Sequence, residues 1–205
     1  AMLLAAVAAL QGQNAAPGLT VLAREGRRTL PIVTAGDQEF VALDDLAGAF
    51  QLAVREEAGA ITVVSRGRTI ILTPNQTLAS VAGRLVSLSS APARLGGRWS
   101  VPLDFINRAL ALVYDTRLDL RRPSHLLVVG DLRVPRITIR YEVVGSAARV
   151  TLDASPGAPS TITQDGNQRL TVKFDADALD LAVPAIQPQG FVQAIRQLDA
   201  VTVAI

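Results

Sequence analysis

Residues 40–52 read FVALDDLAGAFQL, and residues 100–112 read SVPLDFINRALAL. The two stretches start 60 residues apart and share small and apolar residues at matching positions. Within each stretch the apolar residues recur at the three- and four-residue spacing of one helix face. This pattern predicts two copies of a unit in which a strand leads into a short helix. Asp44 and Asp104 fall near the two predicted helix starts, where a carboxylate can cap free amides.

Short apolar segments rich in β-branched residues follow each copy and predict strands. They comprise residues 61–64, 69–72, 85–88, 112–114 and 126–129. Glycine and proline interrupt the chain between them, which is typical of turns. Strands and short helices in this order predict an α+β fold, with two repeated strand–short helix–strand units around an antiparallel sheet. We assign this repeat domain to residues 19–131.

From residue 132 onward, apolar and polar residues alternate along the sequence. Apolar side chains at 137, 139, 141 and 143 alternate with polar ones at 136, 138, 140 and 142. If residues 145 and 146 form the turn, Glu142 lies opposite Arg149 and Thr138 lies opposite Asp153. Further alternating segments predict a mainly antiparallel, sandwich-like β domain over residues 132–205. Because the sequence stops on an apolar strand, we expect more protein to follow.

The amino-acid composition limits the kinds of activity that the chain can have. The chain has 205 residues, of which 49% are hydrophobic, so it can bury a core. Its 20 basic and 18 acidic residues give a net charge of +2 without long basic runs, which argues against nucleic-acid binding. There is no cysteine and one histidine, His125, which excludes thiol nucleophiles and cysteine-based zinc sites. We interpret His125 as a structural residue at a strand end, and we expect neither catalysis nor a cofactor.

Residues 2–10 form an unbroken apolar run that is too short to span a bilayer. Small and polar residues follow it, as in a secretory signal peptide. We interpret residues 1–18 as a clipped, signal-like segment, which predicts a periplasmic or secreted protein. The alternative is a helix docked on its own domain or on a second copy.

Residues of about 37–130 resemble the copper amine oxidase N-terminal-like domain, a stalk-like module of secreted bacterial proteins. The resemblance is carried by residues 96–106, GGRWSVPLDFI, and by residues 79–86, ASVAGRLV. Asp104 stands where that family usually has arginine, which leaves the role of that arginine without a counterpart here. Despite the family's name we expect no copper, because one histidine, one methionine and scattered carboxylates do not form a copper site.

Residues of about 132–205 resemble the AMIN module, which precedes the catalytic domain of many bacterial N-acetylmuramoyl-L-alanine amidases. The carriers are residues 137–143, 148–153 and 169–174. The combined resemblance implies the N-terminal targeting region of such an amidase, with peptidoglycan as the partner. The zinc hydrolase of the parent protein would lie outside these residues, so this part is expected to be non-catalytic.

Arg136, Arg140 and Arg149 share the polar face of the predicted hairpin, where guanidinium groups could bind the carboxylates of stem peptides. The alternative is that they form ordinary cross-strand ion pairs. Trp99 could stack on a sugar ring, or pack against the core. At the level of the whole module, the alternative to peptidoglycan binding is a structural stalk or self-association domain without a ligand. That alternative predicts a homodimer built on the apolar N-terminal run or on an open sheet edge.

Overall fold

The computed structural model describes residues 18–145, 147–166, 168–184 and 192–205. The apolar run at residues 2–10, and with it the expected signal-like segment up to residue 17, lies outside the described residues. Strands before Gly130 and strands after it belong to separate sheets. We refer to residues 18–130 as the N-terminal region and to residues 131–205 as the C-terminal region.

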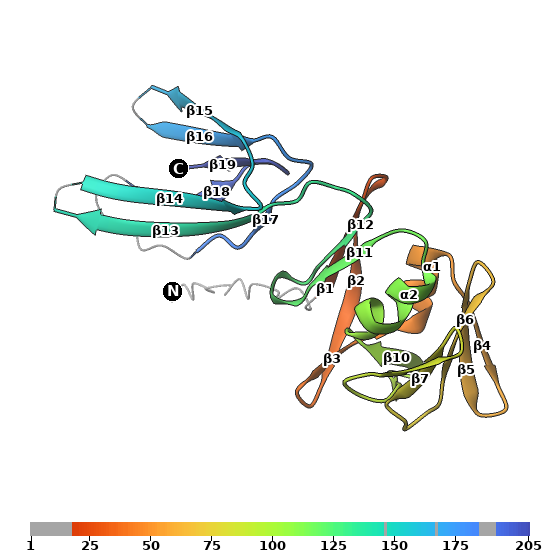
Figure 1. Ribbon diagram of the computed structural model, residues 1–205. Helices are drawn as coiled ribbons and strands as arrows, with labels where there is room; N and C mark the ends of the chain where they lie inside the picture. The colour runs from red at the N-terminus through yellow and green to blue at the C-terminus, as the bar shows by residue number, and fades with distance from the viewer. Residues whose placement is uncertain (1–17, 146, 167, 185–191) are drawn as a thin grey trace, which may run out of the picture.

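A seven-stranded sheet forms one layer of the N-terminal region (Figure 1). Its strands are β1 (Gly18–Ala23), β2 (Gly26–Ala35), β3 (Gln38–Ala42), β9 (Ala93–Leu95), β10 (Arg98–Pro102), β11 (Leu118–Arg121) and β12 (Leu126–Val129). They lie in the order β11-β12-β1-β2-β3-β10-β9. Only the β1–β12 pair is parallel among the described strands of this sheet. In the β3–β10 pair Val41 lies directly opposite Val101.

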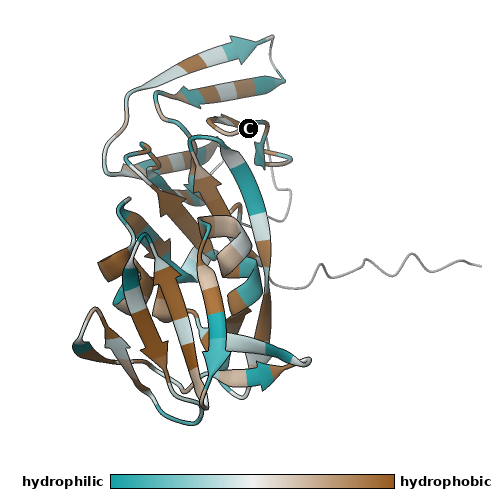
Figure 2. Cartoon of the chain, turned by 90° about the vertical axis from the view of Figure 1, so that its right-hand side faces the viewer, coloured by the Kyte–Doolittle hydropathy of each residue, from teal (hydrophilic) through white to brown (hydrophobic). Residues whose placement is uncertain are grey.

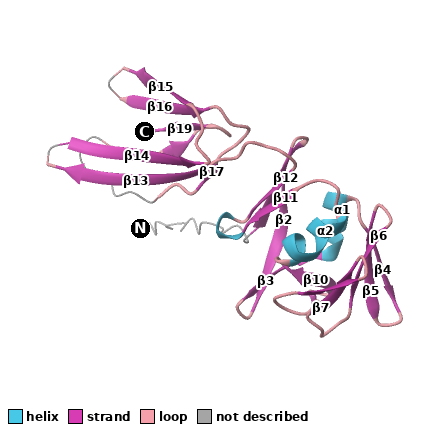
Figure 3. Ribbon diagram, viewed as in Figure 1, coloured by secondary structure: helices cyan, strands magenta, loops and turns pink. Residues whose placement is uncertain are grey.

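A five-stranded antiparallel sheet forms the second layer. It consists of β4 (Ala53–Glu57), β5 (Ala60–Ser65), β6 (Arg68–Leu72), β7 (Leu78–Val81) and β8 (Arg84–Ser87), paired in sequence order. Three helical segments lie between the two layers (Figure 3), namely α1 (Leu43–Phe50) and the consecutive η1 (Ile106–Leu110) and α2 (Ala111–Val113). A short helical turn, η2 (Arg122–Ser124), precedes β12. Leucine, isoleucine, valine and phenylalanine side chains from both sheets and from the helices form one core.

Two local expectations for this region are wrong. Residues 112–114 were expected to form a strand, but α2 continues the helix as far as Val113. Leu110 and Val113 are buried three residues apart whereas Leu112 is exposed, which is the burial pattern of a helix face. The aspartates do not cap the helices either, because no side chain caps the start of α1 at Leu43 or the start of η1 at Ile106.

Asp104 is instead buried, and its carboxylate accepts hydrogen bonds from the backbone N–H and the hydroxyl of Ser89, both at 2.9 Å. It also lies 3.1 Å from Nε of Arg108. Asp44 is exposed. The two equivalent aspartates of the sequence therefore have different surroundings, one in a polar network and one in solvent.

The C-terminal region consists of two facing sheets made mainly of antiparallel strands. One contains β13 (Arg136–Val144), β14 (Ala147–Ser155) and β17 (Asp180–Leu181), in the order β14-β13-β17. The other contains β15 (Ser160–Asp165), β16 (Arg169–Phe174), β18 (Arg196–Gln197) and β19 (Thr202–Ala204), in the order β15-β16-β19-β18. Apolar and polar residues alternate along the hairpin at the top of Figure 2, which is formed by β15 and β16.

The register expected for the first hairpin is confirmed. Glu142 pairs with Arg149 and Thr138 pairs with Asp153. The inner faces of the two sheets meet in a core that includes Ile137, Phe174 and Val203. The fold as a whole is mainly antiparallel β with few short helices, in keeping with the expected α+β class.

A small apolar cluster and an ion pair join the two regions. Leu126 and Val128 of β12 pack with Val134 and Ala178 of the C-terminal region. Beside this cluster Arg121, at the end of β11, reaches across to C-terminal residues. These contacts hold the two regions together where the chain passes from β12 to β13.

Candidate functional site

The three arginines proposed from the sequence lie on the outer face of the β13–β14 hairpin, and all are exposed. Arg140 donates a hydrogen bond of 2.6 Å to the carboxylate of Asp153. Arg149 lies opposite Glu142 in the ladder, yet it forms no ion pair with any described residue. The hairpin therefore presents one paired and one unpaired guanidinium group to solvent, on a rigid antiparallel ladder.

Arg136 belongs to the junction between the two regions. Its Nε lies 3.5 Å from the carboxylate of Asp180, a side chain that is only 4% exposed. The same carboxylate lies 3.2 Å from Nη1 of Arg121, which also donates to the carbonyl oxygen of Val134 at 2.7 Å. Asp180 is thus a buried carboxylate between two arginines, and local patterns do not predict it because β11, β13 and β17 lie far apart in the sequence.

Trp99 lies in the N-terminal region, on a different sheet from the three arginines. It is half-buried and packs against the core. Its indole N–H donates to the carboxylate of Glu56 at 2.9 Å, and the guanidinium carbon of Arg94 lies 4.8 Å from the ring centroid. Arg94 also pairs with Glu56 at 2.7 Å. One face of the ring is therefore covered by a cation–π contact, which leaves less of it for stacking on a sugar.

His125 has a partner that the sequence did not indicate. Its Nε2 lies 2.7 Å from Oε1 of Glu39, on strand β3, and its backbone is in the left-handed region with φ of 46°. Its carbonyl oxygen accepts the backbone N–H of Thr20, which continues the parallel β1–β12 pairing. These contacts agree with the interpretation of His125 as a structural residue at a strand end.

Two carboxylate contacts fix loops of the C-terminal region. Asp175 forms a two-pronged pair with Arg133 at 3.1 and 3.2 Å, and this hydrogen bonding raises the pKa of the Arg133 guanidinium. At the turn before β19, the backbone N–H of Val201 donates to Asp199 at 2.8 Å and lowers the pKa of that carboxyl group. Both pairs lie at the surface and organise turns.

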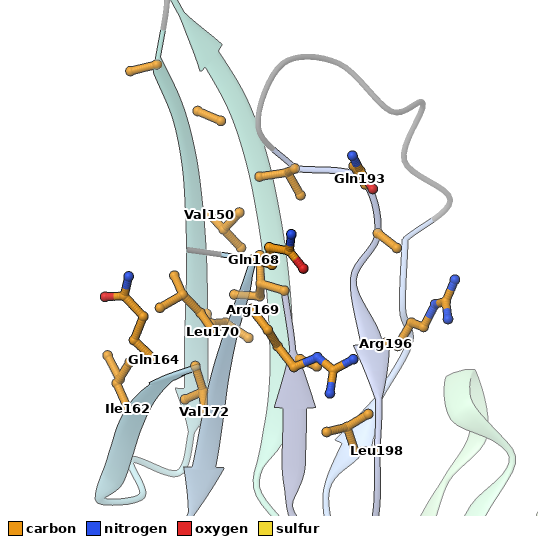
Figure 4. A pocket seen from close by; sticks show the side chains of 17 residues that line it. Val150, Ile162, Gln164, Gln168, Arg169, Leu170, Val172, Gln193, Arg196 and Leu198 are labelled. Atoms are coloured by element: carbon orange, nitrogen blue, oxygen red, sulfur yellow. The ribbon is translucent and has the colours of Figure 1, made fainter. Parts of the chain in front are cut away.

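A cleft of about 1000 Å³ lies between the two sheets of the C-terminal region (Figure 4). Apolar side chains form its floor and include Val150, Leu152, Ile162, Leu170, Val172 and Val192. The polar side chains that line the cleft are those of Gln164, Gln168, Arg169, Gln193 and Arg196. The described residues that line the cleft include no aspartate or glutamate.

The sequence missed this cleft for a physical reason. Alternation along β14, β15 and β16 identifies the side chains that face inward, but it does not determine how far apart two facing sheets lie. Near Phe174 and Val203 the sheets are in contact, and toward the turn of the β15–β16 hairpin they diverge. Ile162, which lines the cleft, is 68% exposed, and the lining residues Leu170 and Leu198 are exposed as well, in keeping with this opening.

Two further features concern the part of the chain that the structure describes. In it, no group of three or more histidine, aspartate or glutamate side chains is placed to hold a metal ion. No helix in this part of the chain combines the length and the apolar character that crossing a membrane requires.

Comparison with known proteins gives one family. No curated protein and no solved structure matches the chain significantly. Residues 26–117, which extend from β2 to the segment before β11, match the family model of the copper amine oxidase N-terminal domain.

Proposed function

We propose that the chain is a non-catalytic cell-envelope module that attaches a parent N-acetylmuramoyl-L-alanine amidase to peptidoglycan, in the periplasm or outside the cell. In this proposal residues 19–131 are the copper amine oxidase N-terminal-like domain, built from two related units, and residues 132–205 are an AMIN-like domain. The match over residues 26–117 supports the first assignment. The pairing of Val41 with Val101, at equivalent positions of the two units, is what a pseudo-twofold arrangement would give.

The observation that carries the binding proposal is the outer face of the β13–β14 hairpin. Arg149 has no ion-pair partner among the described residues, and Arg140 has only Asp153, with both of those side chains more than half exposed. An exposed ion pair of this kind contributes about 0–1 kcal/mol, so a ligand carboxylate can replace Asp153 at little cost. Guanidinium groups bind carboxylates through paired hydrogen bonds, and the stem peptides of peptidoglycan carry carboxylates.

Cosedimentation with purified sacculi tests this proposal. We expect the protein to pellet with sacculi at low salt and to be released as ionic strength rises, because exposed charge pairs are screened. Arg140→Ala combined with Arg149→Ala should reduce the pelleted fraction. Arg66→Ala combined with Arg68→Ala is the matched control, because these exposed arginines lie in the N-terminal region and pair with Asp115. Protein that stays in the supernatant at low salt would contradict the proposal.

A second candidate is self-association, favoured by an apolar stripe on the outer face of the five-stranded sheet. Ile71, Leu78 and Leu85 lie on three neighbouring strands and are exposed, Leu85 to 75%. β8, which carries Leu85, is an open edge of that sheet. Light scattering should give a dimer mass that Leu85→Glu reduces to the monomer, and deletion of residues 1–12 tests the N-terminal run separately. A monomer at all concentrations would exclude this candidate.

A further inference from the structure

Strand β14 is the longest strand at a free sheet edge in the part of the chain that the structure describes. It has nine residues, and only β13 pairs with it. Figure 1 shows the β13–β14 hairpin extending away from the N-terminal region. Natural edge strands are usually protected by proline, by a bulge or by charges along the strand. β14 contains no proline or glycine, and its register with β13 is continuous, so its edge is regular enough to pair with another strand.

The backbone groups of every second residue of β14 point to this edge. The carbonyl oxygen of Pro135 accepts the N–H of Asp180, so the odd-numbered residues at the start of β13 face β17. The even-numbered residues of β13 therefore face β14 and bond to its odd-numbered residues. This leaves the N–H and C=O groups of residues 148, 150, 152 and 154 directed outward. These four residues form no backbone hydrogen bond with any other described segment.

A second copy of β14 fits this edge in one antiparallel register. With Thr151 of the two copies opposite each other, the outward-directed residues pair with one another and can exchange all of their free hydrogen bonds. Val150 then lies opposite Leu152 of the second copy, and both are only partly buried in the single chain. On the outer face, Arg149 lies opposite Asp153 of the second copy, and the twofold axis repeats this pair. A shift of two residues in either direction removes the charge pairing.

The ion pairs within one chain leave these charges available to a second copy. Arg149 forms no ion pair with any described residue, although Glu142 lies beside it in the ladder. Asp153 accepts a hydrogen bond from Arg140 through one carboxylate oxygen, Oδ2, and its other oxygen has no printed partner in this pair. In the proposed register Arg149 lies between Glu142 of its own chain and Asp153 of the second copy. Opposite charges on neighbouring strands stabilise a ladder, and like charges destabilise it.

We infer that two copies of the chain associate through their β14 edges, which joins the two hairpins into one continuous sheet about a twofold axis. The contact lies in the C-terminal region, so it is separate from the apolar stripe that carries Leu85. It does not depend on the proposed attachment to peptidoglycan, although Arg149 belongs to both surfaces.

Sedimentation equilibrium of the whole chain at low salt, over a range of protein concentrations, tests the inference. We expect a reversible equilibrium between monomer and dimer. Arg149→Asp places like charges opposite each other at both ends of the ladder, and so does Asp153→Arg. Each variant alone should therefore associate about tenfold or more weakly. An equimolar mixture of the two variants should regain the association, because every opposed pair in the mixed dimer again has opposite charges.

Two further variants separate the alternatives. Ala148→Pro removes an outward-directed N–H but keeps Arg140 and Arg149, so it should weaken association with an unchanged circular dichroism spectrum and leave the sacculus experiment unaffected. Arg196→Asp is the matched control, because Arg196 is an exposed arginine of the same region without an ion pair to any described residue, and it should leave the equilibrium unchanged. A monomer at every concentration, or a mixture that associates no better than either variant alone, would overturn the inference. A dimer that only Leu85→Glu dissociates would overturn it as well.

Discussion

Substitution of Asp180, whose carboxylate is buried, tests how the two regions are joined. Its side chain is 4% exposed, with Arg121 of the N-terminal region at 3.2 Å and Arg136 of its own region at 3.5 Å. We expect Asp180→Ala to lower the free energy of unfolding and to separate the unfolding of the two regions. The physical reason is that Arg121, 15% exposed, would lose a buried partner and could not be solvated fully in its place.

The size of the effect follows from the distances. At 3.2 Å two unit charges attract by about 5 kcal/mol at an effective dielectric constant near 20. Desolvation offsets part of this attraction, and removal of one partner from a buried pair costs about 3–5 kcal/mol. Arg121 keeps Asp119 at 3.1 Å and the carbonyl oxygen of Val134 at 2.7 Å. The expected loss is therefore about 3 kcal/mol, at the lower end of the range.

Urea denaturation followed by two probes measures it. Trp99 is the only tryptophan, so its fluorescence follows the N-terminal region, whereas far-ultraviolet circular dichroism follows both regions. In the unmodified protein we expect the two transitions to coincide, and in Asp180→Ala we expect the circular dichroism transition to begin at lower urea. Arg121→Ala should behave similarly.

Arg136→Ala is the matched control for this experiment. Its side chain is 56% exposed, so its pair with Asp180 is screened by water and its loss should cost less than about 1 kcal/mol. An equal loss for Arg136→Ala and Arg121→Ala would refute the reasoning. Coincident transitions with an unchanged midpoint in Asp180→Ala would refute it as well.

Three further predictions concern single side chains. Asp104→Ala should lower the free energy of unfolding by about 1–3 kcal/mol because it removes the two hydrogen bonds that the buried carboxylate accepts from Ser89, whereas the equivalent Asp44→Ala should change it by less than about 0.5 kcal/mol in the same urea titration. Phe105→Ala should cost about 3–5 kcal/mol by opening a cavity at a fully buried site, and thermal unfolding should show the loss. The backbone N–H of Val201 holds the pKa of Asp199 below the usual value of about 3.9. The charged carboxylate therefore stabilises the fold fully above that pH, and this stabilisation is lost as the pH falls through the folded-state pKa. NMR titration of the carboxyl group should show the lowered pKa, and Asp199→Asn should remove this part of the dependence of stability on acid pH.

The β13–β14 hairpin shows what the sequence could determine. Side chains of a strand alternate with a period of two, so the apolar set fixes which face is inside. A two-residue turn then fixes the register, and the predicted pairs Glu142–Arg149 and Thr138–Asp153 follow from it. Alternation and the turn alone therefore place the polar groups of the hairpin on the correct face. The alternation does not predict all of their ion pairs, since Arg140 bonds diagonally to Asp153 and Arg136 bonds to Asp180 on the neighbouring strand β17, which is distant in the sequence.

The helix after β10 shows where local patterns fail. Residues 112–114 contain β-branched and aromatic side chains that favour a strand, yet the burial of Leu110 and Val113 against the core extends the helix. Asp104 and Asp44 occupy equivalent sequence positions, but only Asp104 has a neighbouring loop that supplies Ser89. Contacts of this kind, like the separation of the two C-terminal sheets, depend on tertiary packing and leave no periodic signal in the sequence.

The parallel pairing of β1 with β12 has a mechanical consequence. Thr20 lies beside Leu126, so the first described strand and the last strand of the N-terminal region are neighbours and run in the same direction. A force that pulls the start of β1 and the end of β12 apart acts along the strands and loads their hydrogen bonds together in shear, instead of opening them one at a time. If tension were applied across the N-terminal region, the hydrogen bonds between β1 and β12 would therefore resist its stretching.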